Sequence, residues 1–239
     1  MRWVVLLFVS LNAFAQEKSE IRELVGHFGE RPALMNLYVS NQPDGSARVT
    51  GEYLLLPNMQ KRFLEGERSK QLGVTFLREG NSPIFYGRPA LATLQGLWAD
   101  GQFRGGRYGP GGQQRERFEL SEKFPSMEGY SASVRCETSA DRYEASLQYT
   151  AEAGRVRGLE WRTKMLPGPQ TCALSGLEQE AFAGGLRLGA GGCTVTLREL
   201  GEFVLVNADN CSRQCVQGMV EPMLVDRRGQ CHVLRPQVR

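Results

Sequence analysis

The chain has 239 residues, of which 41% are hydrophobic and 23% are charged, and its formal net charge at pH 7 is +3. The charges are balanced along the chain: residues 16–125 carry 15 basic and 13 acidic side chains, and residues 126–239 carry 13 of each. A protein that binds phosphate backbones or anionic lipids carries a clear excess of basic side chains, and neither half of this chain has such an excess. We therefore expect no nucleic-acid partner.

The first fifteen residues, MRWVVLLFVSLNAFA, have the three-part pattern of a cleaved export signal. Arg2 gives a positive start, residues 3–11 are apolar, and the small residues Ala13 and Ala15 precede a polar segment. The apolar run is too short for a permanent membrane span, and no later run is longer. We predict cleavage near Ala15, a periplasmic or secreted mature protein, and no transmembrane segment. A buried N-terminal strand is the alternative interpretation.

The next segment, SEIRELVGHF at residues 19–28, has the spacing of a short helix. Ile21, Leu24, Val25 and Phe28 recur at helical intervals, and Ser19 is a possible N-cap. We therefore expect a short helix at the start of the mature chain.

Short segments with strand character then recur about every ten residues, separated by turns rich in glycine and asparagine. They are LMNLYVS, ARVTGEYLLL, RFLEGE, VTFLRE, PIFYG, ATLQGLW, QFRGGRY and ERFELSE. This pattern is typical of a meandering antiparallel barrel or sandwich. Glycine repeatedly stands two residues before an aromatic, which indicates bends whose exposed backbone the aromatic ring covers; an aromatic-lined ligand mouth is the alternative. These pairs are Gly51 and Tyr53, Gly96 and Trp98, and Gly101 and Phe103.

Several of these strands share short motifs with a recurrent exported β-domain of bacteria, which carries GxY, LxG, LxE, GxW and FxL in this order. Here the motifs are Gly51-Glu52-Tyr53, Leu64-Glu65-Gly66, Leu77-Arg78-Glu79, Gly96-Leu97-Trp98 and Phe118-Glu119-Leu120. Roughly residues 30–122 resemble this domain. The resemblance implies a barrel-like fold and an exported protein, and it implies no activity.

The segment KFPSMEG at residues 123–129 is the expected boundary between two domains, because all six cysteines follow it. We predict an all-β, mainly antiparallel protein: a signal peptide at 1–15, a barrel-like domain at 16–125 and a disulfide-bonded β-domain at 126–239. The second domain is expected to contain a short helix, with Ser175 and Glu178 as a capping box and Gly184 as its end.

An even number of cysteines in an exported chain predicts three disulfides, for which fifteen pairings are possible. The six are Cys136, Cys172, Cys193, Cys211, Cys215 and Cys231. A two-residue turn at Gly201-Glu202 would place Leu200 opposite Phe203, and would put Cys193 on an apolar face. A bond from Cys193 to Cys211 then needs a bulge or a longer turn. The apolar face indicates a buried partner for Cys193, which is either Cys172 or Cys211. The spacings match neither a redox pair nor a zinc site.

No arrangement of residues predicts catalysis, a metal or a cofactor. His27 and His232 are the two histidines, and neither lies in a nucleophile motif. The glycine-rich stretches lack the spacings that bind phosphates. Paired carboxylates such as Glu65 with Glu67, or Glu160 beside Trp161, are the remaining candidates for glycoside hydrolysis.

One stretch combines aromatic residues with arginines, the composition of protein interaction hot spots. We take it as the candidate binding set, with a barrel core as the alternative: Tyr86, Arg88, Trp98, Phe103, Arg104, Arg107 and Tyr108. The hypothesis we favour is a non-catalytic binding protein of the cell envelope, for a protein or a small ligand. The alternatives are a carboxylate-dependent hydrolase of envelope glycans and a structural or assembly protein.

Overall fold

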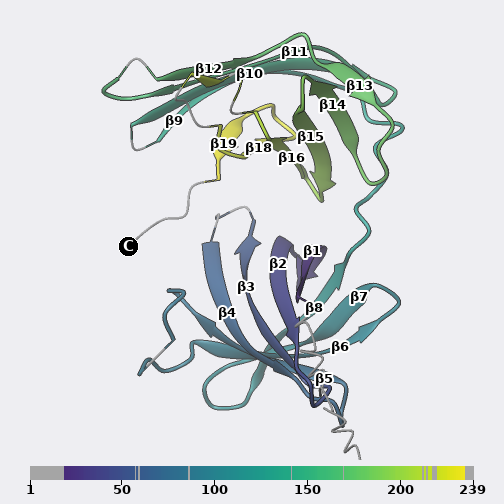
Figure 1. Cartoon of the computed structure of the whole chain (residues 1–239), viewed down its shortest axis with the longest axis vertical. Coiled ribbons are helices and arrows are strands. Elements are labelled where there is room, and N and C mark those ends of the chain that lie inside the picture. Colours follow the sequence, from purple (N-terminus) through teal and green to yellow (C-terminus); the bar gives the residue numbers. More distant parts are fainter. Residues whose placement is uncertain are drawn as a thin grey trace, which may run out of the picture.

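The computed structural model describes residues 19–234, except residues 57, 59, 86, 141, 169, 212, 214 and 217–219. The predicted export signal lies outside the described residues. The described chain is all-β, as predicted, and forms a closed barrel followed by two stacked sheets (Figure 1). No helix that could cross a lipid bilayer occurs in the part of the chain that the structure describes.

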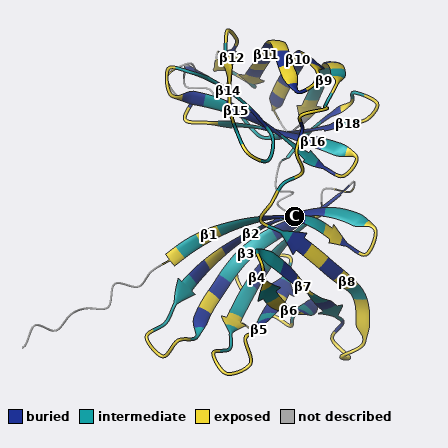
Figure 2. Cartoon of the chain, turned by 90° about the vertical axis from the view of Figure 1, so that its right-hand side faces the viewer, coloured by how far each residue is buried: buried dark blue, intermediate teal, exposed yellow. Residues whose placement is uncertain are grey.

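The barrel confirms the barrel-like N-terminal fold. Each strand pairs antiparallel with the next, and β1 pairs with β8 to close the ring. The strands are β1 (Ser19–Phe28), β2 (Arg31–Asn41), β3 (Ala47–Leu55), β4 (Gln60–Arg68), β5 (Val74–Gly80), β6 (Ala92–Ala99), β7 (Gln102–Tyr108) and β8 (Gln114–Ser121). Buried and exposed residues alternate along them (Figure 2).

The helix predicted for residues 19–28 is wrong, because this segment is strand β1. Leu24 and Phe28 point into the barrel, whereas Val25 packs on the opposite face against the second half of the chain. Apolar residues on both faces of a strand mimic helical spacing, which explains the error. Gly26 lies between Leu24 and Phe28 on the inner face of β1. A Cβ at this position would lie 2.0 Å from the Glu119 carbonyl oxygen of β8, so closure of the barrel requires glycine here.

Side chains fill the barrel interior. Aromatic rings lie over one of the three glycines for which the sequence predicted this: a Cβ on Gly96 would lie 2.5 Å from the Phe103 ring, which takes the place of the expected Trp98. The atoms nearest to Gly51 and Gly101 belong to other kinds of residue. Phe28 stacks on Tyr53, and Trp98 stacks on Phe103. The buried core residues include Leu24, Phe28, Met35, Leu37, Tyr53, Leu64, Leu77, Leu94, Phe103, Phe118 and Leu120.

The second half folds as two antiparallel sheets. The outer sheet has the order β17-β12-β11-β10-β9, and the inner sheet has the order β13-β14-β15-β16-β18-β19. Their strands are β9 (Ala132–Ala140), β10 (Tyr143–Glu152), β11 (Arg155–Met165), β12 (Thr171–Leu174), β13 (Glu178–Glu180), β14 (Leu186–Ala190), β15 (Cys193–Leu200), β16 (Phe203–Asp209), β17 (Cys215–Val216), β18 (Met223–Asp226) and β19 (Cys231–Val233). A shared core lies between the sheets around fully buried Trp161.

Three disulfides confirm the prediction from the cysteine count. Cys136–Cys231 joins the two sheets, Cys172–Cys215 joins β12 to β17, and Cys193–Cys211 closes the β15–β16 hairpin. The predicted hairpin register is also confirmed, with Leu200 opposite Phe203. Asn210 has a φ of 57°, and this left-handed residue breaks the strand alternation just before Cys211.

The second predicted helix, at residues 175–184, is also wrong. Gly176 has a φ of 66°, which interrupts a helix directly after the expected N-cap Ser175. The segment instead contains the edge strand β13. Its Gln179 side chain accepts a hydrogen bond from the Val156 amide and donates one to the Gly154 carbonyl, each at 2.8 Å. These bonds tie the edge of the inner sheet to the β10–β11 hairpin.

The inner sheet is apolar on both faces, because it packs between the outer sheet and the barrel wall. Val204 and Val206 of β16 face the sandwich core, while Leu205 between them joins the cluster against the barrel. That cluster contains Val25, Leu34, Leu54 and Leu56 from the barrel side, and Leu200, Phe203, Leu205, Leu224 and Leu234 from the inner sheet side. Barrel and sandwich therefore meet through an apolar interface.

Candidate functional site

The aromatic and arginine residues predicted to bind a partner do not form one surface. Phe103 is fully buried in the barrel core, and the half-buried Trp98 stacks on it with ring centroids 4.7 Å apart. Trp98 also donates a hydrogen bond to Thr75, and Arg22 lies over its ring at 4.6 Å. These contacts give Trp98 and Phe103 a role in holding the barrel together.

The other members of that set lie elsewhere. Arg88, Arg104 and Tyr108 are on the outside of the barrel, where Arg104 pairs with Glu119 at 2.6 Å. Arg107 points inward, and Tyr86 lies outside the described residues. Binding by the exposed members stays a prediction.

Arg107 belongs to a buried ionic cluster inside the barrel. Glu79 is fully buried and accepts hydrogen bonds from Arg107 at 2.6 and 2.8 Å and from the Tyr53 hydroxyl at 2.7 Å. Arg62 pairs with the same carboxylate at 3.3 Å. Burial and the adjacent Glu79 charge raise the pKa of Tyr53, and the hydrogen bonds to Glu79 raise the pKa of Arg107. Every member has a partner, which is the pattern of a structural cluster.

Composition alone does not reveal this cluster, although the strand periodicity contains a signal for it. Alternation from Thr75 and Leu77 places Glu79 on the inner face of β5, and alternation from Phe103 places Arg107 on the inner face of β7. Charges at inward positions of a closed barrel need partners from other strands, and β-strand periodicity alone does not identify those partners.

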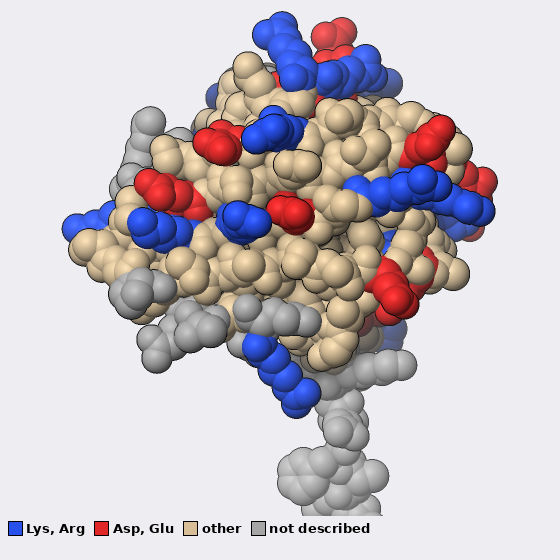
Figure 3. Space-filling model, turned by 90° about the horizontal axis from the view of Figure 1, so that it is seen from above, with Lys and Arg blue, Asp and Glu red and all other residues tan. Residues whose placement is uncertain are grey.

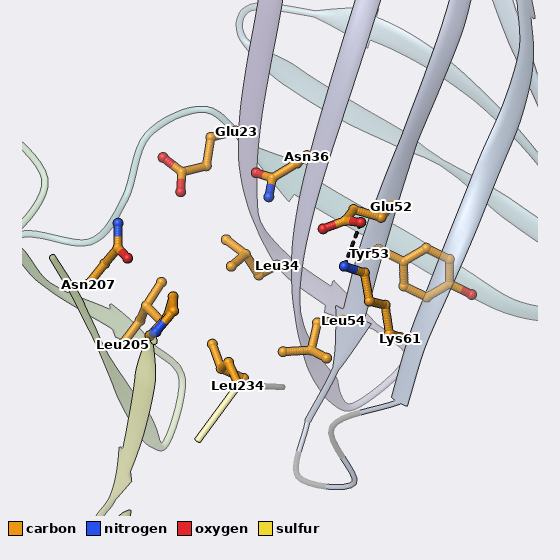
Figure 4. Close-up of a pocket in the computed structure, with 11 residues that line it drawn as sticks. Glu23, Leu34, Asn36, Glu52, Tyr53, Leu54, Lys61, Leu205, Asn207 and Leu234 are labelled. Atoms are coloured by element: carbon orange, nitrogen blue, oxygen red, sulfur yellow. Dashed lines mark ion pairs between the residues drawn. The ribbon is translucent and has the colours of Figure 1, made fainter. Parts of the chain in front are cut away.

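A pocket of about 210 Å³ lies between the outer wall of the barrel and the inner sheet (Figure 4). Strands β1 to β4 supply one wall; β16 and the segments around Pro222 and Leu234 supply the other. Figure 4 shows the Tyr53 ring directed away from this space, so its backbone forms the wall. The lining residues are Glu23, Leu34, Asn36, Glu52, Tyr53, Leu54, Lys61, Leu205, Asn207, Pro222 and Leu234.

The pocket is divided into an apolar part and a polar part. Leu34, Leu54, Leu205 and Leu234 converge on one side, and they also belong to the apolar interface between the two units. Glu23, Asn36 and Asn207 lie on the other side (Figure 4). Such a pocket suits a small apolar group attached to a hydrogen-bonding head.

Ion pairs hold the charged residues of the pocket rim. Glu52 pairs with Lys61 at 2.6 Å across β3 and β4, and Glu23 pairs with Arg198 of the inner sheet. The Asn207 amide donates hydrogen bonds to Asp209. The rim therefore offers amide and carboxylate groups whose charge is already balanced, which favours a ligand without strong net charge.

The pocket could not be assembled from the sequence. Its residues come from both halves of the chain, between positions 23 and 234. Leu34 and Leu205 were visible only as apolar residues within strands. Their convergence depends on the packing of the inner sheet against the barrel, which no local pattern encodes.

The carboxylates proposed for hydrolysis lie in two separate places, and Glu65 and Glu67 line an open hollow on the barrel wall together with Arg48 and Arg78. Glu65 is on the outer wall of the barrel with its partner Arg48 at 3.4 Å, and Glu67 is exposed on the same wall. Glu160 is exposed on the outer sheet, whereas its neighbour Trp161 is fully buried on the opposite face. Among the described residues, no group of histidine, cysteine and carboxylate side chains has the arrangement of a metal site.

The face of the outer sheet carries charges of both signs. Figure 3 shows Lys and Arg interspersed with Asp and Glu over this face. Arg162 and Glu160 of β11 form an ion pair at 3.3 Å. This mixture agrees with the balanced charge counts of the sequence and does not form the basic surface that a polyanion binds.

Comparison of the chain with protein-family models, with curated proteins and with solved structures finds no match in any of the three.

Proposed function

We propose that this chain is an exported, non-catalytic binding protein of the cell envelope, located in the periplasm, and that the pocket between barrel and sandwich holds its ligand. The observation that carries the proposal is the pocket itself, where leucines from both units face an amide and carboxylate rim. Ligand pockets occur preferentially at the junctions of such units. Three disulfides support an oxidising compartment.

The size of the pocket limits the ligand class. A volume of about 210 Å³ is below the range of about 300–1,000 Å³ typical for drug-sized ligands. It suits a small molecule, or one side chain of a partner protein, with an apolar group and a neutral polar head. The apolar group would contact Leu34, Leu54 and Leu205, and the polar head would reach Asn36 and Asn207.

The test fills the pocket without touching the core. Asn36 lies on the outer face of β2, so Asn36→Trp places a large ring in the pocket. Tyr38→Trp is the matched control, because Tyr38 lies two residues further on the same face of β2 and outside the pocket. Native mass spectrometry then compares the two variants with the parent protein after each is incubated with a periplasmic small-molecule extract and separately with hydrophobic dipeptides.

We expect a bound mass on the parent and on Tyr38→Trp, and its loss from Asn36→Trp. Equal adducts on all three proteins, or none on any of them, would overturn the pocket assignment. Export is tested separately by the intact mass of the protein in the periplasmic fraction, which is expected to begin at Gln16.

A further inference from the structure

A second hollow lies on the outer wall of the barrel, over β1, β6, β7 and β8. Its volume is about 680 Å³, which is larger than the 210 Å³ of the pocket at the interface. The hollow is also more open to solvent than that pocket. Two members of the aromatic and arginine set, Arg104 and Tyr108, line it. These two predicted binding residues therefore lie on one exposed surface, although the rest of the set does not.

Tyr108 forms an aromatic platform in this hollow. Its ring lies directly over Gly106, where a Cβ would be 2.7 Å from the hydroxyl oxygen and 2.8 Å from two ring carbons. The ring rests on the glycine backbone in place of a side chain. Tyr108 is half-buried, so part of its ring remains open to solvent. A larger residue at position 106 would displace the ring.

Polar side chains flank the platform on both sides. Gly106 pairs with Gln95 of β6 and with Arg117 of β8, and both of these side chains are exposed. Further along the same wall, Arg104 pairs with Glu119, and their side chains are 57% and 47% exposed. The surface around Tyr108 thus offers an amide, a guanidinium and an ion pair, which together can donate and accept hydrogen bonds.

We propose that this surface, defined by Gln95, Arg104, Tyr108, Arg117 and Glu119, binds a pyranose glycan. The C–H face of a pyranose ring packs on an aromatic ring, and its hydroxyls both donate and accept hydrogen bonds. The Tyr108 platform meets the first requirement, and the flanking groups meet the second. Sugar binding at this surface is independent of the pocket between barrel and sandwich.

Other occupants fit this surface less well. An extended peptide binds a sheet through an open strand edge, and β7, which carries the Tyr108 platform, is paired on one edge with β6 and on the other with β8. A polyanion needs a strong basic excess, and the Glu119 carboxylate neutralises Arg104. A glycan requires neither an open edge nor a net charge.

The experiment is titration calorimetry of the parent protein with linear hexasaccharides of N-acetylglucosamine and of glucose. We expect binding of at least one of them, a loss of affinity of about tenfold in Tyr108→Ala and retention in Tyr108→Phe, which keeps the ring. Gln95→Ala, which changes an exposed side chain beside the platform, is also expected to weaken binding. Tyr38→Ala is the matched control, because Tyr38 is an exposed tyrosine on another part of the barrel wall.

The absence of any heat of binding with either hexasaccharide would overturn the glycan proposal, and so would equal affinity in the parent, Tyr108→Ala and Gln95→Ala. Asn36→Trp separates this proposal from the proposed function. It is expected to bind the hexasaccharide like the parent, since Asn36 lies outside the hollow. Loss of binding in Asn36→Trp would place the sugar in the other pocket and would also overturn this assignment.

Discussion

Arg198 of the inner sheet forms an ion pair with Glu23 of the barrel, and its guanidinium lies 4.4 Å from the centre of the Phe124 ring. Phe124 belongs to the segment between β8 and β9, and the Phe182 ring lies on the same guanidinium at 5.5 Å. One side chain thereby contacts both units and their connection. Because Glu23 also lines the pocket, this ion pair positions part of the pocket rim.

We expect Arg198→Ala to loosen the contact between barrel and sandwich. Loss of the ion pair and of the ring contact should cost about 1 kcal/mol, which corresponds to a roughly fivefold increase in the open population. Trypsin cleavage after Lys123 measures this opening, and the rate is expected to rise by the same factor. Arg162→Ala is the control, because Arg162 is 71% exposed on the outer sheet. An unchanged cleavage rate in Arg198→Ala would contradict the role of Arg198.

Removal of the buried charge of Glu79 should destabilise the barrel strongly. Glu79→Gln removes the carboxylate that Arg107 and Arg62 share and leaves Arg107 with only its second partner, Glu116 at 3.1 Å, at a cost of about 3–5 kcal/mol. Glu65→Gln removes an exposed partner of Arg48 and is expected to cost less than about 1 kcal/mol. Hydrogen exchange of barrel peptides in urea measures the loss of unfolding free energy in both variants. Similar protection in the two variants would show that the cluster contributes little.

The raised pKa of Tyr53 predicts a loss of barrel stability at alkaline pH. Its phenol is held protonated in the folded state, whereas in the unfolded chain it ionises at about pH 10. The stabilisation is therefore complete below about pH 10 and is lost as the pH rises above it, by up to about 1.4 kcal/mol per pH unit. Tyr53→Phe should unfold more easily at pH 8, because it lacks the hydrogen bond to Glu79, but it should show a flatter decline.

Urea midpoints between about pH 9 and 11 measure this slope. Tyr38→Phe is the control, because Tyr38 is 51% exposed and its loss should leave the slope of the parent unchanged. A slope in Tyr53→Phe equal to that of the parent would show that another group causes the alkaline decline.

Two of the three disulfides should differ in their effect on the stability of the sandwich. Cys136–Cys231 spans 95 residues and Cys193–Cys211 spans 18. In the chain-entropy model these closures contribute about 4.7 and about 3.2 kcal/mol, respectively. The double variant Cys136→Ala/Cys231→Ala is therefore expected to lose more stability than Cys193→Ala/Cys211→Ala. Hydrogen exchange of peptides from β9 to β19 measures the loss, and barrel peptides provide the internal control. The reverse order would show that local packing outweighs loop length.

The sequence alone determined the all-β class, the barrel, the three disulfides and the register of the β15–β16 hairpin. These features depend on local information: strand alternation, turn residues and an even number of cysteines. Eight strands were expected before residue 123 and eight are present, but one expected strand is missing and one strand was not expected. The segment PIFYG is not a strand in the described residues, and the predicted helix at 19–28 is strand β1.

Tertiary structure decided the identity of β1, the pairing of the cysteines, the ionic cluster around Glu79 and the position of both candidate sites. Val25 and Leu205 lie on strand faces that a simple barrel or sandwich would expose, and they are buried because the inner sheet packs against the barrel. Glu79 and Arg107 meet across the barrel interior from β5 and β7. Such contacts join residues far apart in the chain, and their energies depend on packing between strands rather than on the periodicity within one strand.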